Sequence, residues 1–286
     1  MNMKIERVCV VGCGLMGRQI GMNAAIHGYP VKLQDNFAKA RESAMAWAED
    51  YLAGRIAKGR MTEEQVAEVK TRFTVCESLE EAAKDADLVI EAIIEVEAAK
   101  ADLFRKLSDI VREDTIIATN SSFMVSSTFA DCVSNPARLA NMHYFNPALV
   151  MKLVEIVAGE HTSSETGEAL MEFCINTGKT PVLMQKELEG FVADTIFKAI
   201  VEASFFLVEN GYCSFEDVDI ACENGLGHKM GPFKTLDLTG VDLAYTIREE
   251  HYVKTGEKMK GYDLLKGLVE AGRYGTKSGK GFYDYE

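Results

Sequence analysis

Two groups of residues in the sequence have the types and spacing that enzyme chemistry requires. The first is a GxGxxG motif that begins at Gly12, follows an apolar run and opens a helical pattern. This is the setting of a dinucleotide-binding turn. The first glycine permits the tight turn, the second lets a pyrophosphate approach the backbone, and the third lets the helix pack on the sheet. The predicted cofactor-binding residues of this turn are Gly12, Gly14, Leu15, Met16 and Gly17.

Asp35 ends the next apolar run. It stands about twenty residues beyond the glycine turn, where a carboxylate binds the 2′-hydroxyl of the adenosine ribose. The residues that follow are Asn36 and Phe37, so no arginine stands immediately after Asp35 to neutralise a 2′-phosphate. The sequence therefore predicts NAD as the cofactor in preference to NADP.

The second group is His143, which ends an apolar run, and Glu155, which interrupts the run 153–157. A carboxylate inside an apolar strand is costly unless it is paired. Neighbouring strands would bring Glu155 to His143, where it would orient the imidazole and favour its protonated form. The histidine would then serve as a general base for a hydroxyl proton. Spacing alone leaves open the alternative of a core histidine and a strand-edge glutamate.

The elements that must position these residues alternate between strand and helix over the first two-thirds of the chain. Strands are expected at 7–11, 30–33, 88–90, 115–118, 139–143 and 153–157, and helices at 16–27, 38–57 and 96–110. Such alternation predicts a doubly wound α/β domain, in which helices cover both faces of a mainly parallel sheet. Capping boxes at Thr62 with Gln65 and at Thr162 with Glu165 indicate helix starts.

From residue 190 onward the pattern is helical, with helices expected at 190–210, 214–223, 241–255 and 263–271. The first of these ends in a left-handed C-cap at Asn210-Gly211. It is also apolar around most of its circumference, which predicts either a central helix or a subunit interface. We place the boundary so that residues 1–186 form the nucleotide-binding domain and 187–286 form an all-α domain.

Composition limits the class of protein. The chain has 286 residues, 47% of them hydrophobic and 26% charged, and a net charge of −13. This acidity disfavours nucleic-acid binding, which selects for lysine and arginine. No apolar run approaches the roughly 20 residues that span a bilayer, and no targeting segment is recognised, so a cytoplasmic protein is expected. The seven cysteines include no CxxC pair, so we expect reduced thiols and no metal site.

The sequence resembles the L-3-hydroxyacyl-CoA dehydrogenases, including the bacterial 3-hydroxybutyryl-CoA dehydrogenases. The resemblance covers nearly the whole chain and is specific, because many motifs occur in one order. These motifs are Val11-Gly-Cys-Gly-Leu-Met-Gly17, Glu91-Ala-Ile-Ile-Glu95, Ala118-Thr-Asn-Ser-Ser122, His143-Tyr-Phe-Asn-Pro147, Met151-Lys-Leu-Val-Glu155, Gly231-Pro-Phe233 and Gly279-Lys-Gly-Phe-Tyr283.

The resemblance implies an NAD-dependent oxidoreductase that interconverts a 3-hydroxyacyl-CoA and a 3-ketoacyl-CoA. It also implies a Rossmann-like N-terminal domain, an all-helical C-terminal domain and a homodimer built through the helical domain. It gives His143 the role of the catalytic base, Glu155 that of its partner, and Ser122 that of holding the substrate oxygen. Residues matched to dinucleotide contacts are Glu95, Lys100 and Asn120. Residues matched to substrate contacts are Ser122, Asn146 and position 194.

The chain departs from the family at Glu189-Gly-Phe-Val-Ala-Asp194-Thr195, where the family reads Pro-Gly-Phe-x-x-Asn-Arg. An amide that can donate a hydrogen bond has become Asp194, which accepts when ionised. This change points either to altered substrate recognition or to helix-start stabilisation with Lys198 four residues on. Arg55, Lys58 and Arg60 form a basic cluster that would suit the phosphates of coenzyme A or, alternatively, a solvated helix end.

Two alternatives follow from these departures. One keeps the hydride chemistry but uses a 3-hydroxy substrate that is free or is bound to a carrier protein. The other is a non-catalytic dinucleotide-binding protein. The joint presence of Ser122, His143 and Glu155 argues against the second alternative, since a binding module has no need of a base.

Overall fold

The computed structural model describes residues 4–285. The chain forms two compact units, and the boundary between them in the sequence follows Val192. Hydrogen bonds hold the connecting segment on the first unit. Glu187 Oε1 accepts from the backbone N–H of Ser127 at 2.8 Å, and the N–H of Val192 donates to Glu155 Oε1 at 3.0 Å. The contacts therefore place residues 187–192 with the first unit, whereas the sequence pattern suggested a boundary after Lys186.

The first unit is built on a sheet of eight strands in the order β3-β2-β1-β4-β5-β6-β7-β8. Neighbouring strands are parallel except for the antiparallel pair β6 and β7. Parallel strands bring their carboxyl ends to one edge, where ligands bind in doubly wound folds. The strands are β1 (Val8–Val11), β2 (Val31–Gln34), β3 (Phe73–Cys76), β4 (Leu88–Glu91), β5 (Ile116–Thr119), β6 (Leu139–Tyr144), β7 (Leu153–Val157) and β8 (Thr180–Met184).

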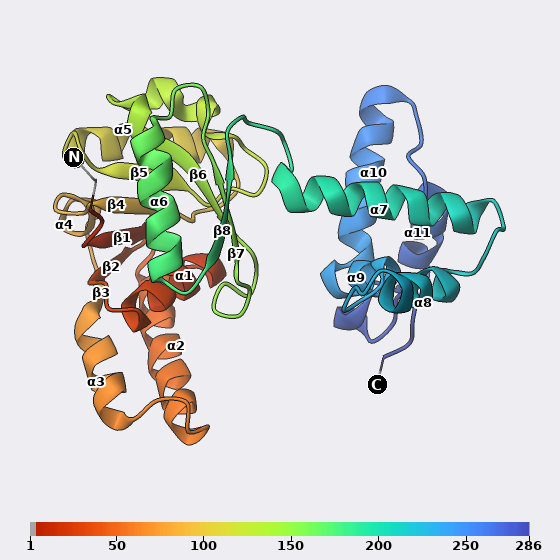
Figure 1. Cartoon of the computed structure of the whole chain (residues 1–286), viewed down its shortest axis with the longest axis horizontal. Helices are drawn as coiled ribbons and strands as arrows, with labels where there is room; N and C mark the ends of the chain where they lie inside the picture. The colour runs from red at the N-terminus through yellow and green to blue at the C-terminus, as the bar shows by residue number, and fades with distance from the viewer. Residues whose placement is uncertain (1–3, 286) are drawn as a thin grey trace. The chain divides into compact units, whose positions relative to one another are not determined.

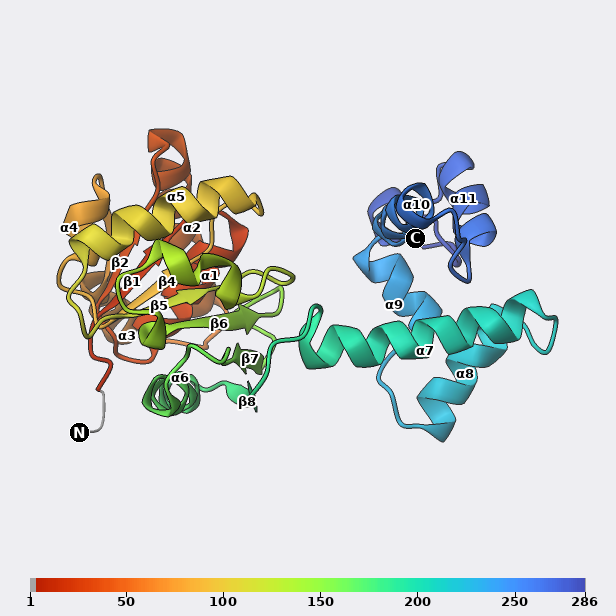
Figure 2. The ribbon, with the colours of Figure 1, turned by 90° about the horizontal axis from the view of Figure 1, so that it is seen from above.

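Helices cover both faces of the sheet. One face packs against α1 (Leu15–Ile26), α2 (Ala38–Ala57), α3 (Glu63–Arg72) and α6 (Ser164–Asn176). The other face packs against α4 (Leu79–Ala83), α5 (Glu97–Ile110) and the 3-10 helix η1 (Ser126–Cys132), which is followed by η2 (Pro136–Arg138). Figure 2 shows α5 and α6 on opposite sides of the strands. The predicted doubly wound architecture is confirmed.

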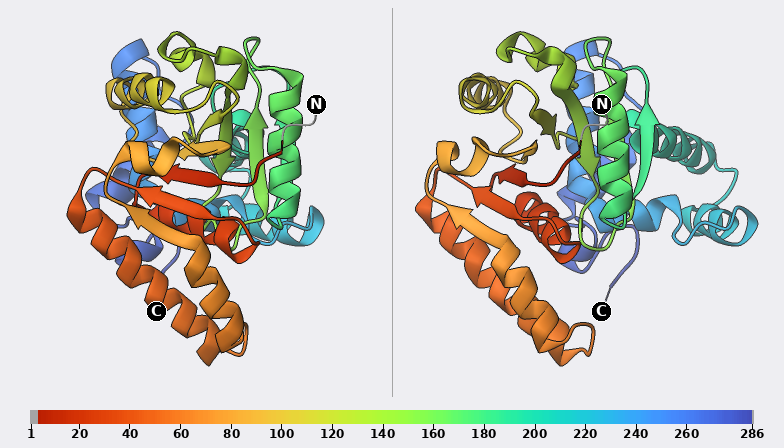
Figure 3. Two further views of the ribbon diagram at one scale, coloured as in Figure 1. Left: turned by 90° about the vertical axis from the view of Figure 1, so that its left-hand side faces the viewer. Right: turned by 60° about the vertical axis from the view of Figure 1, so that its left-hand side comes forward.

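Helices α2 and α3 lie side by side and project from the sheet, with the turn between them at the far end (Figures 1 and 3). The predicted capping box starts α3, because the Thr62 side chain accepts from Gln65 N and the Gln65 side chain accepts from Thr62 N.

The box predicted at Thr162 is wrong by one residue. Ser163 caps α6 by accepting from Thr166 N, whereas the Thr162 hydroxyl donates to Leu139 O and accepts from Gly159 N.

The sequence pattern also missed both edge strands, β3 and β8. Strand β8 reads Thr180-Pro-Val-Leu-Met184 and has an exposed or half-buried side chain at each position. It is short and carries a proline, which argues against a central strand. Proline is tolerated there because an edge strand has a side that needs no ladder hydrogen bond.

The second unit is all α, as predicted. It consists of α7 (Phe191–Glu209), which starts at the end of the first unit, α8 (Phe215–Gly225), α9 (Pro232–Thr239), α10 (Val241–Thr255), α11 (Tyr262–Glu270) and the 3-10 helix η3 (Thr276–Ser278). Gly211, at φ +70°, ends α7 as predicted. No helix among residues 4–285 has both the length and the apolar character needed to cross a membrane.

Two buried carboxylates organise the second unit. Asp219 accepts from the backbone N–H groups of Phe233 and Lys234, in the first turn of α9, at 2.9 and 3.0 Å. Asp237 accepts from the N–H groups of Phe282 and Tyr283 at 2.8 and 2.9 Å. These bonds compensate for burying the charges and fasten the C-terminal segment to the helices.

Candidate functional site

The glycine turn lies at the carboxyl end of β1 and the start of α1. Gly12 has a φ of +112°, and a Cβ there would lie 2.3 Å from the carbonyl oxygen of Ala92. A Cβ on Gly17 would lie 1.8 Å from the carbonyl oxygen of Gly12. Both positions therefore require glycine. A Cβ on Gly14 would meet no atom within 4 Å, so the backbone of the turn is open to approach at this residue.

This turn fits the pyrophosphate of a dinucleotide. Gly14 is the N-cap of α1 and provides no side chain to bond the free N–H groups of the first helical turn. Such N–H groups, with the helix dipole, form an anion-binding site. Leu15 begins the helix and is half exposed, and Met16 beside it is partly buried. The cradle at Gly14 would therefore accept the phosphates that the sequence predicts.

Asp35 is tied to the glycine turn. Its Oδ2 accepts from Cys13 N, and its Oδ1 accepts from Phe37 N, both at 2.9 Å. These bonds fix the carboxylate beside the nucleotide turn, in the place expected for a ribose contact. The sequence reading missed Arg41, which reaches back from the first turns of α2 so that its Nη1 donates to the carbonyl oxygen of Asp35 at 2.6 Å.

Glu95 and Lys100 belong to a buried network at the carboxyl ends of β4 and β5. Lys100 is 1% exposed, and its Nζ lies 2.6 Å from Glu91 Oε1 and 3.0 Å from Glu95 Oε2. Glu91 is fully buried and also accepts from Thr119 Oγ1 at 2.6 Å. The Glu95 side chain is 47% exposed and accepts from the Ser121 hydroxyl. Glu95 therefore faces the open edge, and Lys100 lies behind it as its partner.

Sequence reasoning gave no role to Glu91, although a signal was present. A glutamate that ends the apolar strand Leu88–Glu91 must find partners when it is buried. It finds them in Lys100, the Thr119 hydroxyl and the backbone N–H of Ile93.

Asn120 and Ser122 follow β5 at the same edge. Asn120 Oδ1 accepts from Tyr144 N at 3.0 Å, which joins the end of β5 to the end of β6 beside His143. Ser122 lies two residues further on, in an exposed bend. Asn146, two residues after Tyr144, is also exposed. The structure thus gathers Asn120, Ser122, His143 and Asn146 at the carboxyl ends of β5 and β6.

His143 and Glu155 stand directly opposite each other in the antiparallel pair of β6 and β7. Nδ1 of His143 lies 3.0 Å from Glu155 Oε2. The imidazole is 5% exposed and the glutamate is fully buried, so the two side chains are paired away from bulk water. The register of two strands therefore produces the contact that the spacing suggested.

Residues near the unit boundary complete the surroundings of this pair. Ring centroids of Phe145 and Phe191 lie 4.5 and 5.4 Å from that of His143. Phe191 is buried with a φ of +46°, and Val192 beside it donates its N–H to Glu155 Oε1. The sequence reading did not predict these contacts, because they join segments far apart along the chain.

The remaining predicted substrate residues belong to other elements. Arg55 is in the last turn of α2 and Lys58 is its C-cap, so both stand near the tip of the α2–α3 hairpin (Figure 1). A helix of this length spans about 30 Å, which separates the tip from the strand ends. Asp194 lies in the first turn of α7 and belongs to the second unit.

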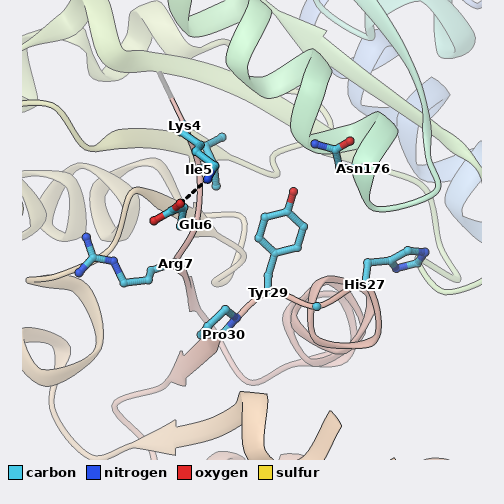
Figure 4. A pocket seen from close by; sticks show the side chains of 9 residues that line it. Lys4, Ile5, Glu6, Arg7, His27, Tyr29, Pro30 and Asn176 are labelled. Carbon is cyan, nitrogen blue, oxygen red and sulfur yellow. Dashed lines mark ion pairs between the residues drawn. The ribbon is translucent and has the colours of Figure 1, made fainter. Parts of the chain in front are cut away.

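A pocket of about 600 Å³ lies at the opposite edge of the sheet (Figure 4). Lys4, Arg7, His27, Tyr29, Pro30 and Asn176 are among its lining residues. Arg7 and Pro30 immediately precede β1 and β2, whereas the glycine turn and His143 lie at the carboxyl ends of their strands. The pocket therefore contains none of the predicted site residues.

Comparison with protein families matches nearly the whole chain. Residues 7–188 match the family model described as 3-hydroxyacyl-CoA dehydrogenase, NAD binding domain. Residues 190–285 match the model described as 3-hydroxyacyl-CoA dehydrogenase, C-terminal domain.

Individual relatives agree with these models. The chain is 36% identical over 285 residues to a probable 3-hydroxybutyryl-CoA dehydrogenase of Bacillus subtilis, with 99% of each chain covered. Among solved structures, an (S)-3-hydroxybutyryl-CoA dehydrogenase from Ralstonia eutropha has a TM-score of 0.87 and 30% identity, and 99% of this chain and 100% of that one are covered. A diketoreductase that acts on dicarbonyl compounds has a TM-score of 0.88 and 28% identity, with 99% of each chain covered.

The glycine turn provides a matched pair of substitutions. Gly17→Ala should destabilise the fold by about 1–3 kcal/mol, because its Cβ would overlap a backbone oxygen. Gly14→Ala should keep the wild-type melting temperature, since its φ of −67° suits alanine and its Cβ meets no atom. It should still weaken NADH binding by at least about tenfold, or 1.4 kcal/mol. Thermal melts and NADH fluorescence titration measure both effects. Wild-type affinity in Gly14→Ala would show that the cofactor does not approach this backbone.

Proposed function

The chain belongs to the 3-hydroxyacyl-CoA dehydrogenase family, and from this membership we propose that it interconverts 3-hydroxybutyryl-CoA, or a related 3-hydroxyacyl-CoA, and the 3-ketoacyl-CoA with NAD as the cofactor. The observation that carries the proposal is the buried His143–Glu155 pair at 3.0 Å. The pair lies at the same edge of the sheet as the glycine turn. The proposed base and the proposed nucleotide-binding turn are therefore at one edge of the sheet.

The proposed mechanism assigns a task to each nitrogen of His143. Nδ1 faces Glu155 Oε2, so Nε2 is the nitrogen that we assign to the substrate. Nε2 takes the proton of the 3-hydroxyl group during oxidation and returns it during reduction. Glu155 keeps the ring oriented and stabilises the imidazolium that forms when Nε2 takes the proton.

Other residues hold the reactants in place. Bound NAD supplies the acceptor for the hydride that leaves C3 of the substrate, and the protein supplies placement and electrostatics. Ser122 and Asn146 are assigned to the substrate oxygens. Glu95 and Asn120 are assigned to the dinucleotide, and Lys100 supports Glu95 from behind. In the same proposal, Arg55 and Lys58 meet the phosphates of coenzyme A.

A second candidate keeps this chemistry but changes the substrate. Asp194 stands where the family has asparagine, and a diketoreductase is among the structural relatives. A substrate without coenzyme A, or one bound to a carrier protein, would need no basic site for nucleotide phosphates.

We also propose a homodimer formed through the helical unit. Helix α7 buries Val201 and Phe205, yet Ile196 is 55% and Phe206 41% exposed in the single chain. Exposed apolar residues continue over α8 to α10 at Ile220, Leu238, Leu243, Ile247 and Val253. Exposed apolar residues mark an interface where they form one continuous patch. A cytoplasmic location belongs to the same proposal, because all seven cysteines are free thiols and would stay reduced there.

The function is tested through the base. Wild-type protein should reduce 3-ketobutyryl-CoA with NADH, and His143→Gln should lower turnover by about 10²–10⁴, the usual contribution of a general base. NADH affinity should stay close to wild type, because the substitution leaves the glycine turn intact. NADH absorbance and fluorescence measure the two quantities. Turnover within a few-fold of wild type would make His143 a core histidine and remove the mechanism.

The substrate is tested through Asp194→Asn. With an ordinary acyl thioester in contact with this residue, asparagine should raise activity on 3-ketobutyryl-CoA, most clearly at high pH, where a carboxylate cannot donate a hydrogen bond. A substrate that donates to Asp194 should instead be used less well, at a cost of about 1–3 kcal/mol. Asp263→Asn, which changes a carboxylate in the first turn of α11, is the control. Unchanged activity together with a lower melting temperature would leave Asp194 as a helix-start residue only.

The dimer is tested by mass. Light scattering at micromolar concentration should report about twice the chain mass of 31.6 kDa, because the apolar residues of α7 to α10 would then be covered. A monomer at this concentration contradicts the interface.

A further inference from the structure

The segment that joins His143 to Glu155 runs from the end of β6 to the start of β7, over residues 145–152. It carries Phe145, whose ring lies against the imidazole of His143, and the exposed Asn146. The position of this loop therefore determines which side chains lie beside the imidazole of His143 at the end of β6.

Lys179 holds the loop from within the first unit. Its Nζ donates to the carbonyl oxygen of Ala148, and to that of Met151 at 2.9 Å. Lys179 is only 8% exposed, and its ammonium lies 5.9 Å from the centre of the Tyr144 ring. Burial lowers the pKa of this amine. A buried lysine is costly unless its donors are satisfied, and here both named acceptors are backbone carbonyls of one loop.

Gln19 holds the same loop from another element. It is 6% exposed on α1, two residues after Gly17, and its Oε1 accepts from Leu149 N at 3.3 Å. Asn23 lies one helical turn further on, and its Nδ2 donates to the carbonyl oxygen of Thr177 at 3.1 Å. Helix α1 thus fastens both the loop and the turn that carries Lys179.

We propose that Lys179 and Gln19 are positioning residues of the dehydrogenase reaction, which clamp the 145–152 loop so that His143 keeps a fixed place relative to α1. This inference rests on the proposed function, because it assigns the glycine turn of α1 to the cofactor and His143 to the substrate proton. The polar side chains of α1 then connect the glycine turn to the loop that carries Phe145 beside His143. Neither clamp residue touches the reactants; both act through the loop.

The test compares Lys179→Met with Lys152→Met, which removes an exposed lysine from the same loop. Measurements are kcat, KM for 3-hydroxybutyryl-CoA, the Kd of NADH, the melting temperature and the deuterium isotope effect on kcat with substrate labelled at C3. Lys179→Met should lower kcat by about 10²-fold, the effect of a misplacement of about 1 Å. The isotope effect should increase, because hydride transfer becomes slower relative to the other steps. The Kd of NADH should change less than twofold, and Lys152→Met should match wild type in every measurement.

A purely structural lysine would lower the melting temperature and leave kcat and the isotope effect unchanged, which would overturn the proposal. If Lys179→Met does not fold, Gln19→Met decides, since it removes only the acceptor for Leu149 N and keeps a side chain of similar length. A wild-type kcat in folded Gln19→Met would then overturn the proposal. Failure of the proposed function gives a different result, namely no turnover by wild-type protein with any 3-hydroxyacyl thioester.

Discussion

The site depends on one constraint, which is that a carboxylate buried in an apolar sheet must be paired. Glu91 and Glu155 are both fully buried, at the end of β4 and in the middle of β7. Glu91 is satisfied by Lys100, the Thr119 hydroxyl and a backbone amide. Glu155 is satisfied by His143 and by the amide of Val192. The partner of Glu155 is His143, the proposed base. The partner of Glu91 is Lys100, which also contacts Glu95, a proposed dinucleotide contact. The contacts that pair the buried charges are therefore also the contacts that position the site.

The second unit meets the same constraint in another way. Asp219 and Asp237 are also fully buried, and they accept hydrogen bonds from backbone amides and from the hydroxyls of Tyr283 and Tyr285 in place of charged side chains. Neither kind of donor carries a charge at neutral pH, so these carboxylates act as fixed anchors. The contrast separates the two kinds of buried acid in this chain. Those of the second unit hold the fold, whereas Glu155 is opposite the histidine that would act as the base.

Hydrogen bonds between segments far apart in the sequence also organise the first unit. The helix that begins at the glycine turn also carries Gln19 and Asn23, which bond to the loop after β6 and to the turn before β8. Val192, at the start of α7, bonds to the glutamate opposite His143. Because interiors are close-packed, a displacement at one of these points is transmitted to the others rather than absorbed locally.

The sequence by itself determined the central strands, the glycine turn and the position of Asp35, because these follow from local rules: apolar runs and glycine at a strand-to-helix turn. The cost of a charge within an apolar strand made the pairing of Glu155 with His143 one of two interpretations, and the spacing alone did not decide between them. The tertiary structure alone decided that Lys100 is buried behind Glu95 and that Glu91 is the centre of the network around Lys100. It also decided that Phe191 lies near the ring of His143 and that Lys179 contacts the 145–152 loop. It also supplied the edge strands β3 and β8, which are only four and five residues long. The physical reason is that a sequence pattern reports which side chains need partners, whereas the identity of each partner depends on which distant segments the sheet places side by side.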